Sequence, residues 1–193
     1  MRRRTLDALL TTGGLVLAAV LLVAGGLLTW GYTFVNHQVH DQLANQKITM
    51  PSGEAIAEPT IKPYLSQYAG QQLTTGAQAE AYANHFIAVH LQGIGGGKTY
   101  SQLSAAAMAN PNDPKLAGQV ATTFKGETLR SMLLNAYAFW KMGQIALYAA
   151  IAAFVGAGLM LLLSLLGFAH LRRVDPEVEV LTGPALRAKV ATA

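Results

Sequence analysis

Residues 142–169 read MGQIALYAAIAAFVGAGLMLLLSLLGFA and carry no charged side chain, and neither do residues 8–32, which read ALLTTGGLVLAAVLLVAGGLLTWGY. Each stretch exceeds the roughly 20 residues that a helix needs to cross about 30 Å of hydrocarbon. Only 12% of the 193 residues are charged, against about a quarter in soluble domains. The sequence therefore predicts an all-α membrane protein with two transmembrane helices, at residues 8–32 and 142–169.

The positive charges beside these stretches predict the orientation. Residues 2–4 and 172–173 are all arginine, and they flank the first and the second stretch respectively. Because Lys and Arg are enriched on the cytoplasmic side of membrane proteins, we expect residues 1–7 and 170–193 in the cytoplasm and 33–141 outside it. The expected location is the bacterial cytoplasmic membrane, as a multi-pass protein.

Residues 33–140, between the two stretches, are electrically neutral. Its basic residues are Lys47, Lys62, Lys98, Lys115, Lys125 and Arg130, and its acidic residues are Asp41, Glu54, Glu58, Glu80, Asp113 and Glu127. The formal net charge of +4 therefore comes from the flanks and the tail, where it suits the anionic inner leaflet of a lipid bilayer. This distribution argues against nucleic acid as a partner. With no cysteine, disulfides and thiolate chemistry are excluded.

A cleaved signal peptide is the alternative interpretation of the first stretch. The stretch is longer than a typical apolar core of a signal peptide, and it ends in Trp30 and Tyr32, which suit a membrane interface. Ala24, Gly25 and Gly26 form the small-residue site at which cleavage could occur. We expect the first helix to be retained.

Proline and glycine positions predict the organisation outside the membrane. Residues 48–76 contain three prolines and no sustained period, which predicts a loop. A helix is expected from Thr75 to about Gly93, with one apolar face made of Ala79, Tyr82, Ala83, Phe86 and His90. Residues 115–169 contain no proline, so one long helix is expected there.

The two long helices are expected to extend outside the membrane as a paired stem in a small helical bundle. Leu129, Met132, Leu133, Ala136 and Trp140 form an apolar stripe, which should pack against Phe34, Val35, Val39 and Leu43. The helix that contains residues 79–90 should cover the remaining side. Within the membrane, close packing of the helices is expected at small residues, namely Gly14, Ala18, Gly25, Ala149, Ala153 and Ala157. The polar, proline-containing tail at 170–193 is expected to be disordered.

Few residues suggest chemistry. His37, His40 and Asp41 recur at i, i+3 and i+4, which is a possible metal-ligand spacing, and His85 and His90 could join them. Solvated or core histidines are the simpler interpretation. Glu80 and Glu127 are the carboxylates of the two amphipathic helices, and the sequence gives no reason to pair them. Residues 95–99 read GGGKT but lack the upstream glycine and strand of a phosphate-binding loop, so we expect a turn and a helix cap.

A set of positions resembles a group of small two-span membrane proteins from actinobacteria. These positions are Trp30, Ile48, Thr49, His90, Gly95, Gly96, Gly97, Lys98, Thr99, Tyr100 and Leu103. The resemblance covers residues 15–168 and implies two membrane spans. Many proteins of this group bear the automatic label "aromatic ring-opening dioxygenase". The sequence argues against that chemistry, because it offers neither the sheet-containing fold nor the histidine and carboxylate set that hold such an iron.

The function that these features predict is structural or accessory. We expect a non-enzymatic membrane protein without a cofactor, whose outer region contacts another membrane or envelope protein, or a second copy of itself. A sensor of an extracytoplasmic ligand or metal, using the 48–76 loop and the histidines, is the alternative. An enzyme is a third possibility.

Overall fold

The computed structural model describes residues 3–173, and within this range the chain is helical without a named strand. A single antiparallel bridge joins Thr49 to Gln72. The elements are α1 (Arg3–Asn45), η1 (Gly53–Ile56), α2 (Lys62–Leu65), η2 (Ser66–Tyr68), α3 (Gly76–Tyr82), η3 (Ala83–Ile87), α4 (Ala88–Gly95), α5 (Tyr100–Ala109) and α6 (Pro114–Leu171). The disordered tail was predicted at 170–193; residues 174–193 lie outside the described range, and at 170–171 the prediction is wrong, because α6 continues to Leu171.

The chain divides into two compact units. One, here called the terminal unit, combines Met1–Trp30 with Ala146–Ala193, and the other, the central unit, is Gly31–Ile145. Helices α1 and α6 each contribute to both units. Both helices are long and apolar enough to cross a membrane, which confirms the prediction at that level.

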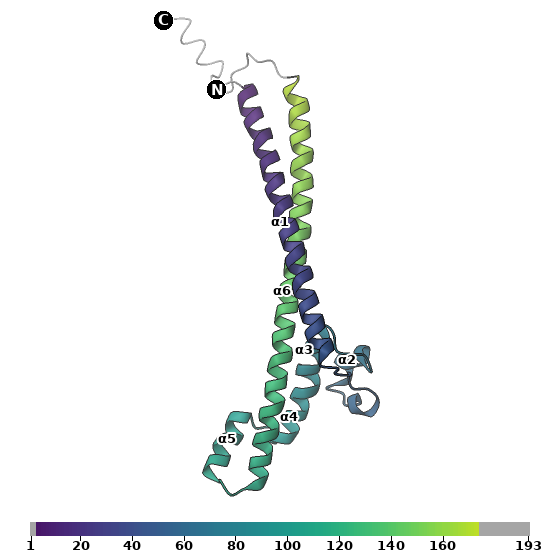
Figure 1. The fold of residues 1–193 in the computed structure, drawn as a ribbon, viewed down its shortest axis with the longest axis vertical. Helices are drawn as coiled ribbons and strands as arrows, with labels where there is room; N and C mark the ends of the chain where they lie inside the picture. The colour runs from purple at the N-terminus through teal and green to yellow at the C-terminus, as the bar shows by residue number, and fades with distance from the viewer. Residues whose placement is uncertain (1–2, 174–193) are drawn as a thin grey trace, which may run out of the picture. The chain divides into compact units, whose positions relative to one another are not determined.

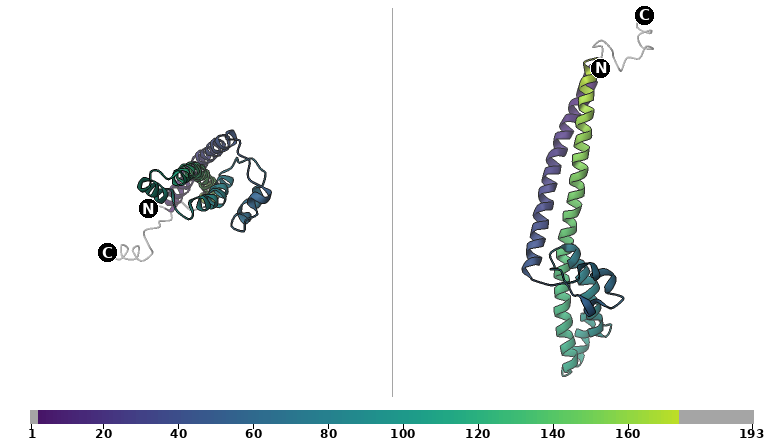
Figure 2. Two further views of the ribbon diagram at one scale, coloured as in Figure 1. Left: turned by 90° about the horizontal axis from the view of Figure 1, so that it is seen from below. Right: turned by 90° about the vertical axis from the view of Figure 1, so that its right-hand side faces the viewer.

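The terminal unit consists of α1 and α6 lying side by side (Figures 1 and 2). Their contact runs through small residues: a Cβ on Gly14 would lie 2.6 Å from the Ser164 hydroxyl, and one on Gly25 would lie 2.9 Å from the Phe154 ring. Ala18 and Ala157 are fully buried. The backbones therefore approach closely, as small residues permit.

The prediction of the contact line between the helices is wrong at one residue. Ala149 is exposed, and its neighbour Ala150 is buried together with Ala153 and Ala157. The sequence analysis followed a strict spacing of four residues, which drifts around an α-helix of 3.6 residues per turn. The contact line instead alternates steps of three and four, as two helices in lengthwise contact require.

The central unit has a core of large apolar side chains. Its fully buried members include Met50, Ile61, Leu65 and Leu73, all from the segment that was expected to be a loop. That segment instead contains η1, α2 and η2 and lies against the core formed with α1, α3, α4 and α6. Irregularly spaced apolar residues gave no period in the sequence, yet short helical turns bring them to one side.

The helix that begins at Thr75 contains a π-helical turn, η3, between α3 and α4. Its start matches the prediction. The Thr75 hydroxyl accepts a hydrogen bond from the Gln78 backbone amide at 3.3 Å, and the Gln78 side-chain oxygen accepts one from the Thr75 backbone amide. A π-turn holds more residues than an α-turn, so it rotates everything after it about the helix axis. The buried line consequently runs through Ile87 and Leu91, and His90 is exposed rather than part of the apolar face.

The prediction of one long helix after Pro114 is confirmed. Asp113 caps it, because its Oδ1 accepts the backbone amides of Lys115 and Leu116 at 2.9 and 3.2 Å. The helix then continues for 58 residues. Gly126 does not end it; a Cβ there would collide with the Leu91 side chain, so this glycine lets α4 approach α6.

The turn at residues 95–99 is also as expected. Gly96 and Gly97 have φ of +59° and +78°, which only glycine adopts readily, and they end α4. Thr99 then caps α5, with its hydroxyl accepting the amide of Gln102 at 3.4 Å.

Candidate interaction groove

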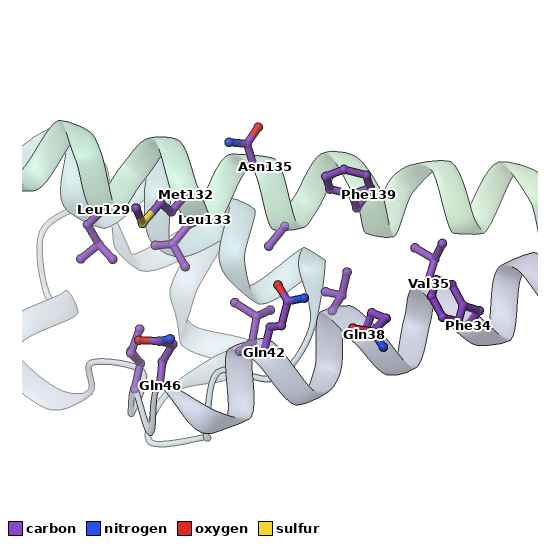
Figure 3. A pocket seen from close by; sticks show the side chains of 14 residues that line it. Phe34, Val35, Gln38, Gln42, Gln46, Leu129, Met132, Leu133, Asn135 and Phe139 are labelled. Atoms are coloured by element: carbon purple, nitrogen blue, oxygen red, sulfur yellow. The ribbon is translucent and has the colours of Figure 1, made fainter.

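An elongated groove of about 590 Å³ lies between α1 and α6 in the central unit. From α1 come Phe34, Gln38 and Gln42, which are spaced four residues apart along one side of the helix, and Gln46 follows in the turn after it. From α6 come Leu129, Met132, Leu133, Asn135, Ala136 and Phe139. Figure 3 shows Leu129 and Leu133 pointing from α6 into this space and Gln42 reaching into it from α1.

The groove has a buried floor and an exposed rim. Val39, Leu43 and Leu133 form the floor and belong to the core of the unit. At the rim, the exposed fractions of Phe34, Met132 and Phe139 are 52%, 65% and 55%. These large apolar side chains lie at the mouth of a concave surface, which is the arrangement expected of a binding site.

Part of the packing that was expected between α1 and α6 is wrong. Val39, Leu43 and Leu133 pack in the shared core, with Val35, Ala136 and Trp140 partly buried against it. Leu129, Met132 and Phe34, which were expected to pack between the helices, are exposed. The reason is that residues 46–95 cover one side of the α1–α6 pair, through contacts such as Gly76 with Trp140, and leave this side open.

The lining of the groove is uncharged. The fourteen residues that form it are apolar or carry amides, and the amides belong to Gln38, Gln42, Gln46 and Asn135. A surface of this kind has no fixed charge with which to bind an ion or a phosphate, and no acid, base or nucleophile for catalysis. It suits an apolar or amide-bearing surface instead. Both apolar stripes can be recognised in the sequence, which predicts that they pack against each other rather than line an open groove.

The histidines of the sequence analysis do not converge. His37, His40 and Asp41 are exposed on α1. His85 stacks on Tyr64 with ring centroids 3.4 Å apart and planes 4° apart, and a ring nitrogen of His90 lies 2.8 Å from the carbonyl oxygen of Phe86. Throughout residues 3–173, no group of three or more His, Cys, Asp or Glu could hold a metal ion.

Glu80 and Glu127 stand at the two ends of one polar network, which sequence reasoning missed. The Asn84 amide donates to Glu80 Oε1 at 2.9 Å, and its oxygen accepts from Arg130 Nη2 at 3.1 Å. Arg130 Nη1 in turn lies 3.3 Å from Glu127 Oε2. The network joins η3 to α6 and so helps to hold these two elements together. The two carboxylates are separated by Arg130 and Asn84 rather than paired as acid and base.

A second, smaller cavity of about 240 Å³ lies in the terminal unit beside Thr11, Gly14 and Ser164. Thr11 and Ser164 are buried, and the Thr11 hydroxyl donates to the carbonyl oxygen of Asp7 at 2.7 Å. This internal bond satisfies the hydroxyl within its own helix.

No protein-family model matches this sequence, and searches of curated proteins and of solved structures find no similar protein.

Proposed function

We propose that this chain is a two-span protein of the bacterial cytoplasmic membrane, with both ends in the cytoplasm. Its central unit is then an extracytoplasmic helical bundle that binds another protein of the membrane or envelope in a structural or accessory role, without enzymatic activity. The observation that carries this proposal is the uncharged groove between α1 and α6, with its buried floor and its exposed rim of Phe34, Met132 and Phe139.

The terminal unit supports the membrane part of the proposal. In the most apolar window of each long helix, 17% of the residues are buried within the chain, so most of these side chains need an apolar surrounding that the chain does not supply. Lipid supplies it. The arginines at 2–4 and 172–173 support cytoplasmic ends by the positive-inside rule.

The chemistry of the groove supports binding rather than catalysis. A protein surface with apolar residues and a few amides would fill the groove without leaving a buried charge unpaired. We further propose membership of the actinobacterial two-span group that the sequence resembles, without its dioxygenase label. The lining offers no histidine or carboxylate with which to bind iron.

The membrane topology can be tested cleanly because the chain has no cysteine. A membrane-impermeant maleimide applied to intact spheroplasts should label Lys98→Cys, and should label Thr5→Cys only after permeabilisation. Labelling of both positions in intact spheroplasts, or of neither after permeabilisation, would contradict the proposed topology.

The groove can be tested by photocrosslinking in living cells. A photoreactive amino acid at Met132, on the rim, should capture a protein that mass spectrometry then identifies. Met108 is the matched control, since it is also an exposed methionine of the central unit but does not line the groove. Capture from Met132 that Gln42→Glu abolishes, with none from Met108, is the expected result. Equal capture from both positions, or none from Met132, would count against the groove as a binding site.

A further inference from the structure

We infer that the occupant of the groove is a second copy of this chain, so that two central units pair groove to groove around a two-fold axis. This inference rests on the proposed function and names the partner at that same site. Three features of the groove support a second copy over an unrelated protein. They are its electrical neutrality, its amides, which can pair with their own equivalents, and its exposed rim side chains, which could fill the groove of a second copy.

Neutrality removes the main obstacle to self-association. In a two-fold dimer each residue near the axis meets its own equivalent, so a charged lining would bring like charges together. None of the fourteen lining residues is charged. The charged residues nearby in sequence, such as Asp41 on α1 and Lys47 in the turn after it, lie outside the lining.

The amides can satisfy one another across the axis. Gln38 and Gln42 lie four residues apart on α1, Gln46 follows in the turn after it, and each carries both a donor and an acceptor. A glutamine can therefore pair with the same glutamine of a second copy, which a carboxylate or an ammonium group cannot do. Such pairs also fix the register between copies, as a buried amide does in coiled coils.

The exposed side chains at the rim of one copy could fill the groove of the other. Phe34, Met132 and Phe139 together expose on the order of 300 Å² of apolar surface, which is comparable to the largest apolar patch of a typical monomer. Among the lining residues of α6, Leu129, Met132, Ala136 and Phe139 are separated by steps of three and four residues, the spacing with which helices pack lengthwise. Two such helix pairs facing each other form a four-helix arrangement, in which the rim of one copy fills the groove of the other.

The first test uses Gln42, which lies in the middle of the α1 stripe and is exposed. In the full-length, otherwise cysteine-free chain in native membranes, Gln42→Cys should form a disulfide-linked dimer under mild oxidation. The matched control is Met108→Cys, which should stay monomeric. A dimer from both variants would indicate random collision and would overturn the inference.

The second test exchanges charge between two differently tagged copies. Gln42→Glu alone and Gln42→Lys alone should each reduce co-purification of the two tags by at least about tenfold, because like charges face each other. Co-expression of the Glu copy with the Lys copy should restore co-purification. Far-UV circular dichroism of each variant checks that the exposed substitution leaves the helices folded. Failure of the mixed pair to recover would overturn the inference.

These tests separate this inference from the proposed function. If Met132 captures a different protein while Gln42→Cys stays monomeric, the proposed function holds and the second copy is the wrong partner. If the groove copurifies with bound lipid and captures no protein, both fail. Capture of the chain itself from Met132, together with recovery by the Glu–Lys pair, supports both.

Discussion

The terminal and central units are both apolar, but they use their apolar residues in opposite ways. In the terminal unit the buried contact consists of small residues such as Ala18 and Ala157, and leucines such as Leu17 point outward. In the central unit the buried contact consists of large side chains such as Met50 and Leu65. The same two helices, α1 and α6, contribute to both arrangements.

The difference follows from what surrounds each unit in the proposed topology. In water, burying a leucine is favourable by about 25 cal/mol per Å² of apolar surface, so large side chains turn inward. In lipid that force is absent, and helices associate through close backbone contact at small residues. The contrast is therefore an argument, independent of hydropathy, for placing the terminal unit in lipid.

The largest expected effect is the loss of a buried leucine from the central unit. Leu65→Ala removes a fully buried side chain and leaves a cavity, which should lower the free energy of unfolding of this unit by about 2–5 kcal/mol. Leu17→Ala, at an exposed position of the terminal unit, should change it by less than about 0.5 kcal/mol. Hydrogen exchange of the chain in detergent measures both. Equal effects would remove the contrast between the units.

A designed disulfide should sharpen the description of the α1–α6 pair in the central unit. A Cβ on Gly143 would lie 3.7 Å from the Val35 Cβ, within the range that disulfides require. Val35→Cys with Gly143→Cys should therefore crosslink and stabilise the unit by about 2–4 kcal/mol. Thiol titration and unfolding with and without reductant check this. Val35→Cys with Gly118→Cys is the control and should stay reduced; a pair at 35 and 143 that also stays reduced would disprove this register.

Two adjacent glycines test the small-residue contact of the terminal unit. Gly25→Leu must displace the Phe154 ring and should cost about 1–3 kcal/mol. Gly26→Leu is the matched control, because nothing lies within 4 Å of a Cβ there. Faster hydrogen exchange in the terminal unit of the Gly25 variant alone is the expected result. If both variants behave alike, the two helices do not meet at Gly25.

The cap of α3 should have a smaller effect. Thr75→Ala removes the hydroxyl that accepts the Gln78 amide and should cost about 1 kcal/mol. Thr99→Ala makes the same change at α5, whose cap is exposed. Gln78 is buried and also bonds to Gln71, so exchange should rise beyond α3 into residues 71–75 for the Thr75 variant only. Identical, strictly local effects would show that Gln78 does not couple the two segments.

The sequence predicted what depends on local pattern. Helix starts followed from the caps at Thr75 and Thr99, and the two long helices followed from the absence of proline. Features that depend on tertiary packing were missed. The π-turn at η3 is not encoded in any spacing that could be recognised in advance, and it moved His90 out of the apolar face.

The groove was missed for a related reason. The sequence shows that Met132 and Leu133 are both apolar, but only the position of the covering segment decides which of them becomes buried. That segment, residues 48–76, lacked a period and was expected to be a loop. Its short helices bury Ile61 and Leu65 on one side of the α1–α6 pair, and the opposite side remains available for binding.

The smallest expected effect concerns pH and tests the core of the central unit. Burial raises the pKa of the Tyr82 phenol above its ordinary value of 10.0. Below pH 10 the phenol is protonated in both the folded and the unfolded chain, so the contribution of Tyr82 to stability is fully present there. As the pH rises from 10 toward the higher pKa of the folded state, the unfolded chain loses this proton first, and the folded state loses stability relative to it. Tyr82→Phe lacks this proton, so its urea midpoint should fall less than that of the unmodified chain between pH 8 and pH 11. If the two midpoints fall in parallel over that range, the partial burial of Tyr82 does not raise its pKa in the folded central unit.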